Sequence, residues 1–233
     1  MSMSESGPIK KHLVRAYDDD IEQITRLITE MGAIVEQQVA FATQALAEGD
    51  EHAARTVIDR DPQVDALEER LDQTAIRVLA IRQPMAIDLR IIAMALKISN
   101  DLERMGDYAV NIAKRVIRLQ SQTRIRPIPT MVMMSEMCQE MVKDILDAYI
   151  ARDPDKAMAV WKRDQEVDNA HNSVFRELLT YMLEDPRKIT PCIDLIFIAK
   201  NLERIGDHAT NIAEKIHYMI HGHEINRSRD DEQ

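Results

Sequence analysis

The sequence contains few of the residues on which β-sheet folds depend. Only 4% of its 233 residues are aromatic, and only 6 are glycine. A β-sandwich or a barrel uses many aromatic and β-branched side chains in its strands and many glycines in its turns. Hydrophobic residues nevertheless make up 45% of the chain and charged residues 30%, which is typical of a folded globular protein. The composition therefore favours a helical fold.

Basic surface and long apolar runs are also scarce. The formal net charge is −10, and no stripe of Lys and Arg interleaved with aromatics occurs. Nucleic acids and anionic membranes both require a cationic surface, so neither is expected as a direct partner. Apolar runs such as "IIAMALKI" and "CIDLIFIA" are shorter than the roughly 20 residues of a membrane-spanning helix, and no signal peptide is apparent. These features predict a cytoplasmic protein without direct membrane insertion.

Catalytic and redox motifs are missing as well. Cys138 and Cys192 follow no metal-ligand or redox spacing, which predicts reduced, packed thiols. No nucleophile elbow, P-loop or Rossmann glycine pattern is present. Glu214 and His217 have the Glu-x-x-His spacing of di-iron oxidases but no second copy, and a group of histidines near His221 is interpreted as fortuitous. The sequence therefore predicts a protein that is not an enzyme.

Helical periodicity predicts six long helices, bounded by turn residues and prolines. The helices are expected over about Asp18–Glu48, Glu51–Arg82, from after Pro84 to Gln120, Thr130–Ala151, Asp153–Glu184 and Arg187–His221. Residues 121–129 hold two prolines and no helical period, which predicts a linker. Residues 1–17 and 223–233 are expected to be flexible segments.

The second half of the chain repeats the first. "DLERMGDYAVNIA" (101–113) aligns without gaps with "NLERIGDHATNIA" (201–213), and "DRDPQVD" (59–65) corresponds to "WKRDQEVD" (161–168). Short loops between long helices imply antiparallel neighbours. The predicted fold is therefore all-α, a tandem repeat of two three-helix up-down-up bundles related by a pseudo-twofold. The bundles are expected to cover residues 18–120 and 130–222.

Each repeat carries two pairs of acidic residues spaced four residues apart, which places both carboxylates of a pair on one helix face. Like charges at this spacing cost an isolated helix roughly 0.2–0.5 kcal/mol. A glycine inside the helix, which each repeat also has, costs about 1 kcal/mol relative to alanine. The pairs lie on sequential helices, so four carboxylates should converge in each repeat. They are Asp61, Asp65, Glu103 and Asp107 in the first repeat, and Asp164, Asp168, Glu203 and Asp207 in the second.

Carboxylates gathered in this way would raise one another's pKa unless a cation relieves the repulsion. All-oxygen sites suit hard cations such as Mg²⁺, Mn²⁺, Ca²⁺ or iron. Ion pairs with the arginines that adjoin the acids in sequence are the alternative. Those arginines lie roughly 100° round the helix from the acids, so they should point elsewhere unless they reach another helix. They are Arg60, Arg104, Arg163 and Arg204.

Gly106 and Gly206 lie between the paired acids on a different face, where a missing side chain lets another backbone come close. Asn111 and Asn211 continue the acidic stripe by one turn and offer an amide oxygen as a further ligand or hydrogen-bond partner. Pro62 lies inside the first acidic motif, and a proline there is expected to kink the helix next to Asp61.

Several of these motifs resemble those of the PhoU family, which contains phosphate-transport accessory and regulatory proteins. The resemblance runs from about Asp18 to His221. It rests on the two "LER(M/I)GD…NIA" segments, on "DPQVD" and "DQEVD", on "MGAIVEQQV" and on "AIRQPMAIDLR". It implies two three-helix bundles, each with two E(D)xxxD motifs. In some family members these motifs bind iron or zinc clusters, and others hold different cations.

Carried over to this chain, the resemblance implies divalent or trivalent metal ions (iron, zinc, manganese or magnesium) at the eight acidic residues. It also implies a non-enzymatic, homodimeric negative regulator of the phosphate-starvation response that modulates phosphate uptake. Such a regulator would connect the ATPase subunit of a phosphate ABC transporter with a membrane sensor histidine kinase. Two alternatives remain at this point: a metal-dependent hydrolase or oxidase that uses the same carboxylates, and a helical scaffold without metal.

Overall fold

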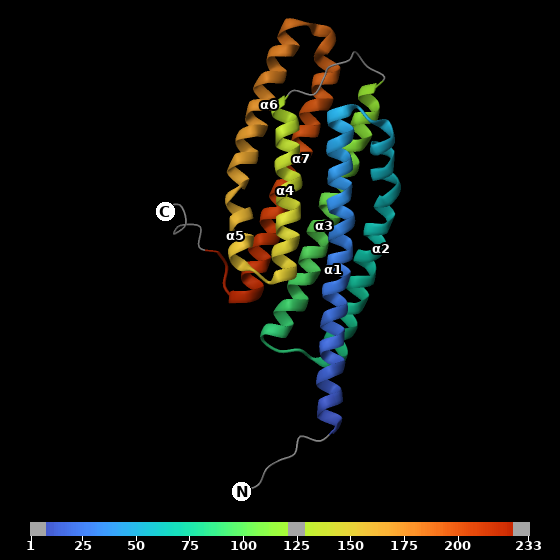
Figure 1. Ribbon diagram of the computed structural model, residues 1–233, viewed down its shortest axis with the longest axis vertical. Coiled ribbons are helices and arrows are strands. Elements are labelled where there is room, and N and C mark those ends of the chain that lie inside the picture. Colours follow the sequence, from blue (N-terminus) through green and yellow to red (C-terminus); the bar gives the residue numbers. More distant parts are fainter. Residues whose placement is uncertain (1–7, 121–128, 226–233) are drawn as a thin grey trace.

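The computed structural model describes residues 8–120 and 129–225, with side chains from Asp18 onward, and these residues form an elongated bundle of helices (Figure 1). No strand occurs in the described ranges. The elements are α1 (Pro8–Glu48), α2 (Glu51–Arg82), α3 (Ile87–Gln120), α4 (Pro129–Ala151), α5 (Pro154–Lys162), α6 (Asp164–Glu184), a 3₁₀ turn η1 (Pro186–Lys188) and α7 (Ile189–His221). The all-α prediction is confirmed.

The helices form two three-helix bundles, as the repeat predicts. In the first, α1, α2 and α3 contact one another and run up, down and up along the long axis (Figure 1). In the second, α4, the α5–α6 rod and α7 do the same in the opposite sense. The bundles meet where α3 packs against α7 and α1 against α4.

Two helix starts differ from the prediction. The first helix begins at Pro8, not at about Asp18, so residues 8–17 of the predicted flexible segment belong to α1. Proline is favoured in the first turn of a helix because its missing N–H is not needed there. The last helix begins at Ile189, after η1, and not at Arg187. Residues 1–7 and 226–233 of the predicted flexible ends, and 121–128 of the predicted linker, lie outside the described residues.

The predicted fifth helix is interrupted at Arg163. It starts as expected, because the Asp153 side chain accepts hydrogen bonds from the N–H groups of Asp155 and Lys156. At Arg163 the backbone N–H bonds to the carbonyl of Val160, three residues back, which is the tighter 3₁₀ pattern. In the first repeat, by contrast, α2 continues through Pro62, so the disturbance expected there is not a break in the helix.

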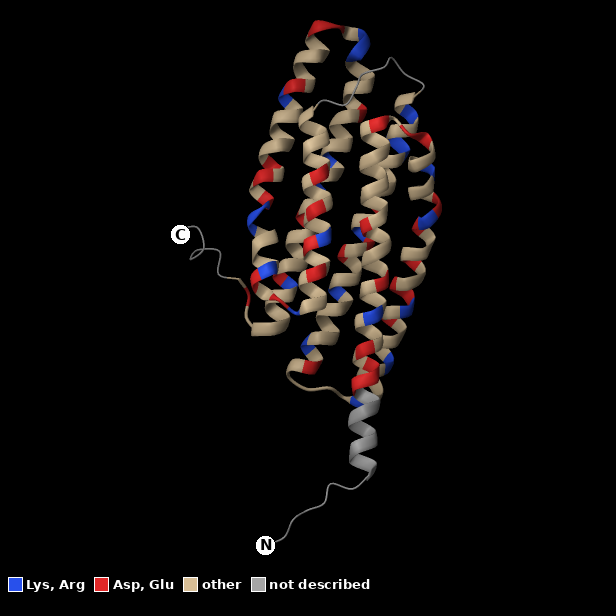
Figure 2. Ribbon diagram, in the orientation of Figure 1, with Lys and Arg blue, Asp and Glu red and all other residues tan. Residues whose placement is uncertain are grey.

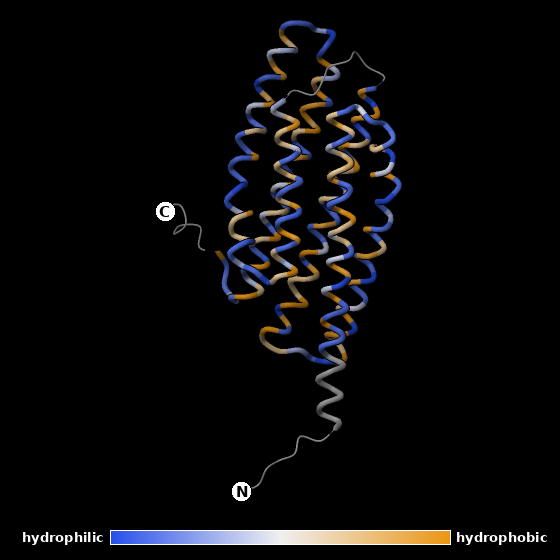
Figure 3. Tube along the Cα trace, viewed as in Figure 1, coloured by the Kyte–Doolittle hydropathy of each residue, from blue (hydrophilic) through white to orange (hydrophobic). Residues whose placement is uncertain are grey.

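Apolar residues recur among polar ones along the helices (Figure 3), and the buried ones form one hydrophobic core with residues from both bundles. Met31, Leu71 and Ile98 are fully buried in the first bundle, and Met134 and Ile212 in the second. Both cysteines are buried and reduced, as predicted. Acidic and basic residues are interspersed over the surface of both bundles (Figure 2).

Two buried aspartates connect the repeats. Asp101 on α3 is 5% exposed; one carboxylate oxygen lies 2.9 Å from Nδ1 of His208, and the other pairs with Lys215. Asp194 on α7 is 3% exposed and lies 2.9 Å from the guanidinium of Arg115. Each aspartate thus finds its cation on the other repeat. Within the described residues, no helix has the length and apolar character that crossing a bilayer requires.

Candidate functional site: two carboxylate clusters

The acidic pairs of the first repeat come together between α2 and α3, and we call Asp61, Asp65, Glu103 and Asp107 the N-terminal cluster. Burial raises the pKa of Glu103 to about 6, with further contributions from the charges of Asp107 and Asp65. Burial also raises the pKa of Asp61, to which Asp65 and Asp107 contribute. The charge of Asp107 on α3 thus acts on Asp61 of α2, and the charge of Asp65 on α2 acts on Glu103 of α3, which is what convergence of the two faces requires.

The second repeat forms an equivalent C-terminal cluster between α6 and α7, made of Asp164, Asp168, Glu203 and Asp207. Burial raises the pKa of Asp164 to about 6, and the charges of Asp168, Asp207 and Glu203 add to this effect. Burial and the neighbouring Glu203 raise the pKa of Asp207. Both repeats thus hold a carboxyl group whose pKa lies above its ordinary value.

A ninth acid, Glu68 on α2, belongs to this environment, and the sequence reasoning missed it. Burial raises the pKa of Glu68, and its charge in turn helps to raise the pKa of Glu103. Its position in the sequence could have indicated this, because a residue three positions after Asp65 lies on the same helix face as Asp65. At the corresponding position the second repeat has His171, so this feature is not duplicated.

The two clusters also differ at one position where α3 and α7 align, which is residue 114 in α3 and residue 214 in α7. Lys114 on α3 lowers the pKa of Asp61, which partly offsets the effect of burial. Glu214, one hundred residues later on α7, adds to the raised pKa of Asp164. One carboxylate oxygen of Glu214 accepts a hydrogen bond from Nε1 of Trp161 at 3.2 Å. The C-terminal cluster therefore has an extra negative charge where the N-terminal cluster has a positive one.

Two of the four adjoining arginines pair with the acids. Arg104 lies 3.1 Å from Asp107 and 3.3 Å from Glu103, and Arg204 lies 3.4 Å from Asp207 and 3.9 Å from Glu203. The expectation that these side chains point away was wrong for this pair, because an arginine side chain is long enough to bend back along its own helix. The other two contact different groups: Arg60 reaches Gln37, and Arg163 reaches Glu140 and Asp144.

The arginines do not satisfy the glutamates completely. Among the residues that the structure describes, the buried Oε2 atoms of Glu103 and Glu203 accept no hydrogen bond, although the Nε groups of Arg104 and Arg204 lie 3.3 Å and 3.9 Å away. Lys200 pairs with the other oxygen of Glu203. A buried carboxylate oxygen without a hydrogen bond is costly, and it occurs at the same position of both repeats.

The glycines between the acids allow close packing of side chains, not of backbone as expected. A Cβ atom at Gly106 would lie 3.0 Å from Oε1 of Gln38 and 3.6 Å from Oδ1 of Asp61. A Cβ atom at Gly206 would lie 3.4 Å from Cγ1 of Val167. Each glycine therefore lets the helix that carries Glu103 or Glu203 approach the other acidic helix.

Different residues underlie the two clusters on α1 and α4. The fully buried Gln38 donates from Nε2 to Oδ1 of Asp61 at 3.3 Å and to the carbonyl of Val57 at 3.4 Å. Cys138, one hundred residues later, donates from Sγ to the carbonyl of Leu202 at 3.2 Å. Burial raises the pKa of the Cys138 thiol to about 12, so it is an uncharged packing group.

The clusters fit a cation by their chemistry but not by their present side-chain positions. In the described part of the chain, no three His, Cys, Asp or Glu side chains are arranged to hold a metal ion as they stand. The donors are nevertheless all carboxylate oxygens, which suit hard cations, and each cluster has a buried oxygen without a hydrogen-bond partner. Binding would require Arg104 and Arg204 to release these oxygens.

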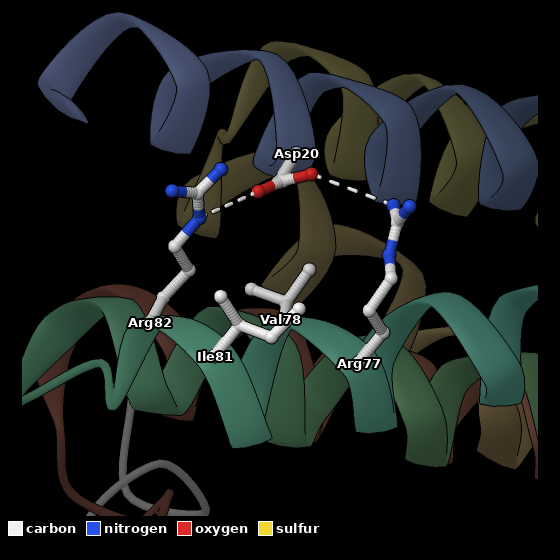
Figure 4. Close-up of a pocket in the computed structure, with 5 residues that line it drawn as sticks. All are labelled: Asp20, Arg77, Val78, Ile81 and Arg82. Atoms are coloured by element: carbon white, nitrogen blue, oxygen red, sulfur yellow. Dashed lines mark hydrogen bonds and ion pairs between the residues drawn. The ribbon is translucent and has the colours of Figure 1, made fainter. Parts of the chain in front are cut away.

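A small pocket between α1 and α2 is a structural contact (Figure 4). It is lined by Asp20, Arg77, Val78, Ile81 and Arg82, and none of the eight predicted acids lines it. Asp20 lies between the two arginines, 3.5 Å from Arg77 and 2.9 Å from Arg82. Its charged groups therefore pair with one another and hold α1 against α2.

Comparison with known proteins identifies the family. The PhoU domain model matches residues 28–116 and again residues 131–216, one match in each bundle. The chain belongs to the PhoU family. The eight acids fall within these two matches, which is consistent with the duplicated clusters.

Relatives of this PhoU-family chain align over nearly its whole length. It is 48% identical to a phosphate-specific transport system accessory protein PhoU homolog from Zymomonas mobilis, over 92% of this chain and 90% of the relative. It is 46% identical to a protein with the same description from Caulobacter vibrioides, over 94% of this chain and 96% of the relative.

Solved PhoU structures share the fold. The crystal structure of PhoU from Pseudomonas aeruginosa superposes with a TM-score of 0.84 at 38% identity, covering 89% of this chain and all of that one (100%). The phosphate transport system regulatory protein PhoU from Streptococcus pneumoniae gives a TM-score of 0.83 at 25% identity, over 90% and 99% of the two chains. PhoU proteins are accessory and regulatory proteins and not enzymes, so the hydrolase or oxidase alternative is set aside.

Proposed function

We propose that this PhoU-family chain is a negative regulator of the phosphate-starvation response and a modulator of phosphate uptake. It would act in the cytoplasm as a metal-binding adaptor between the ATPase subunit of a phosphate ABC transporter and a membrane sensor histidine kinase. The relatives support the link to phosphate transport, since they are described as accessory proteins of that system. The observation that supports the metal-binding part is the buried glutamate oxygen in each repeat that accepts no hydrogen bond.

The metal would be iron, zinc, manganese or magnesium, held by the carboxylates of the two clusters. A bound cation supplies positive charge that lets all four carboxylates of a cluster ionise together. The chain's own residues provide the rest. Glu103 and Glu203 offer the buried oxygens, and Arg104 and Arg204 occupy the clusters as exchangeable counterions.

A cation at each cluster would tie neighbouring helices of one bundle together. In the first repeat it would join α2 to α3, and in the second it would join α6 to α7. Because α3 and α7 also pack against each other, the metal-bound state of both repeats would stiffen the whole bundle. This gives the adaptor a physical means by which cation content changes the surface that partners meet.

The regulatory part is tested in the cell. Deleting the gene should switch on phosphate-starvation genes in high phosphate, measured with a transcriptional reporter, and the wild-type gene should restore repression. The double variant Glu103→Gln, Glu203→Gln should restore repression poorly if metal binding matters. The matched control is Glu69→Gln, Glu166→Gln, which removes the same charge from exposed positions of α2 and α6. Unchanged reporter activity on deletion would contradict the proposed regulatory role.

The metal-binding part is tested on purified protein. Elemental analysis after purification without chelator should find bound metal in the wild type and in the Glu69→Gln, Glu166→Gln control. The amount should fall sharply in Glu103→Gln, Glu203→Gln. Equal metal content in the two double variants would refute the assignment of the glutamates, while leaving the regulatory proposal to the reporter experiment.

Partner binding needs purified proteins. The chain should bind the transporter ATPase subunit and the cytoplasmic part of the sensor kinase in calorimetric titrations. Light scattering coupled to gel filtration should give twice the monomer mass of 26.7 kDa if the chain forms the proposed homodimer. A chain that binds neither protein would argue against the adaptor role even if the reporter responds.

A further inference from the structure

Three histidines that the proposed function does not use gather at the end of α7. His217 and His221 are four residues apart on the helix, so they lie on one face, and His223 follows just after the helix end. Their ring centres lie 4.6 Å (His217–His221), 5.2 Å (His217–His223) and 5.8 Å (His221–His223) apart. All three rings are thus mutual neighbours at one point of the surface.

Gly222 creates this arrangement by turning the chain back. Its backbone is left-handed, with φ 77° and ψ 11°, and its N–H donates to the carbonyl of Tyr218 at 2.9 Å. This is a common way for a helix to end, and glycine adopts the conformation without strain. A Cβ atom at this position would also collide with the guanidinium of Arg90. The glycine is therefore what brings His223 back over the last turn of α7.

Backbone carbonyls orient two of the rings. Nδ1 of His217 lies 3.2 Å from the carbonyl oxygen of His223, and Nδ1 of His223 lies 3.2 Å from the carbonyl oxygen of Glu224. A carbonyl only accepts, so in the neutral rings Nδ1 carries the proton and Nε2 carries the lone pair. Metal-binding histidines are held in this way, with one ring nitrogen donating to a carbonyl and the other facing the ion.

The ring spacing matches what a metal ion needs. With a metal–nitrogen distance of roughly 2.0–2.1 Å, an imidazole centre lies about 3.2 Å from the ion, and two rings at a tetrahedral angle have centres about 5 Å apart. The observed separations of 4.6 Å, 5.2 Å and 5.8 Å bracket this value. As the side chains stand, their nitrogens do not converge on one point. The ring of His221 is exposed, so its rotation is the movement that would bring the nitrogens together.

We propose that His217, His221 and His223 form a surface binding site for a transition-metal ion of the type that prefers imidazole, such as Zn²⁺, Ni²⁺ or Cu²⁺. Imidazole donors favour these ions, whereas the carboxylate clusters favour harder ones, so the two kinds of site differ in selectivity. The negative end of the α7 dipole favours a cation here. The positive charge of the nearby Arg90 disfavours a cation at the same place. The affinity of the site would therefore come from the bonds between the metal and the imidazole nitrogens.

The test is a titration of the full-length chain with Zn²⁺, followed by the NMR signals of the histidine rings at pH 7.5. The ring signals of His217, His221 and His223 should shift together, and that of His52 should not. Each single variant His217→Gln, His221→Gln or His223→Gln should weaken this zinc binding at least tenfold. The matched control is His52→Gln, which removes an exposed imidazole from α2 and should bind zinc like the wild type.

Two further variants separate this site from its surroundings. Gly222→Ala keeps all three histidines but disturbs the turn, so it should weaken zinc binding about as much as His223→Gln. Glu103→Gln, Glu203→Gln should leave the histidine shifts unchanged, so a failure of the carboxylate proposal would not affect this result. Zinc that leaves these three ring signals unmoved, or that binds Gly222→Ala normally, would overturn the proposal.

Discussion

Replacing each cluster glycine by alanine tests the packing of the two acidic sites, because the same change meets different neighbours in the two repeats. Alanine stabilises a helix interior by about 0.8–1.0 kcal/mol relative to glycine. At Gly206 the new methyl group would lie 3.4–3.8 Å from Val167, which is ordinary van der Waals contact. We therefore expect Gly206→Ala to raise the free energy of unfolding by about 1 kcal/mol, which corresponds to roughly 2–4 °C in Tm for a chain of this size.

At Gly106 the same methyl group would lie 3.0 Å from Oε1 of Gln38. Gln38 is fully buried and is held by hydrogen bonds of 3.3 Å to Asp61 and 3.4 Å to Val57, so it has little room to move. Overpacking of a buried site typically costs about 1–3 kcal/mol. We expect this cost to exceed the helix gain, so Gly106→Ala should lower stability by about 1 kcal/mol.

The assay is urea denaturation of both variants, followed by far-UV circular dichroism at one pH. In a chain that carries Gln38→Ala, the side chain that obstructs the new methyl group is gone, so Gly106→Ala should raise the free energy of unfolding. Effects of the two substitutions that do not add indicate direct contact between the two positions. If Gly106→Ala stabilises the otherwise unchanged chain as much as Gly206→Ala does, Gln38 yields freely and the reasoning is wrong.

Three other predictions concern charge. Asp101→Asn should destabilise the chain by about 3 kcal/mol, since it removes the buried charge that pairs with the half-buried Lys215. By contrast, Arg26→Ala, which breaks an exposed pair, should change urea stability by less than about 0.5 kcal/mol. Because burial raises the pKa of Glu103 and Asp164 to about 6, the folded chain binds protons more tightly than the unfolded chain. The urea midpoint should therefore rise from pH 7 to pH 5, and less so in Glu103→Gln, Asp164→Asn; an equal rise would contradict the assigned cause. Mn²⁺ at pH 7 should raise the midpoint of the wild type but not of Glu103→Gln, Glu203→Gln, and an identical rise would mean that the ion binds elsewhere.

Most of the fold follows from local patterns that repeat. The spacing of Glu103 and Asp107, and of Glu203 and Asp207, fixes one face of a helix, and an exact offset of one hundred residues indicates a duplicated unit. Those features depend only on helical geometry, which is why the all-α fold and the convergence of the acids could be predicted. The interruption at Arg163 could not, because no proline or glycine lies there.

The sequence alone does not determine which of several possible partners a long side chain contacts. Arg104 and Arg163 each adjoin the first acid of an acidic pair, yet Arg104 bends back to its own helix and Arg163 reaches α4. Glu68 lies on the same helical stripe as Asp65, but its raised pKa comes mainly from burial, which the spacing alone does not predict. Tertiary packing determines these contacts and burial depths.

The crossed pairing of Asp101 and Asp194 has a consequence for the independence of the two halves. A lone copy of either half would lose the Lys215 or Arg115 that pairs with its buried aspartate. It would also expose to water the face of α3 or α7 that the other half covers. In the present chain the halves have become mutually dependent, so neither is expected to survive as an autonomous fragment.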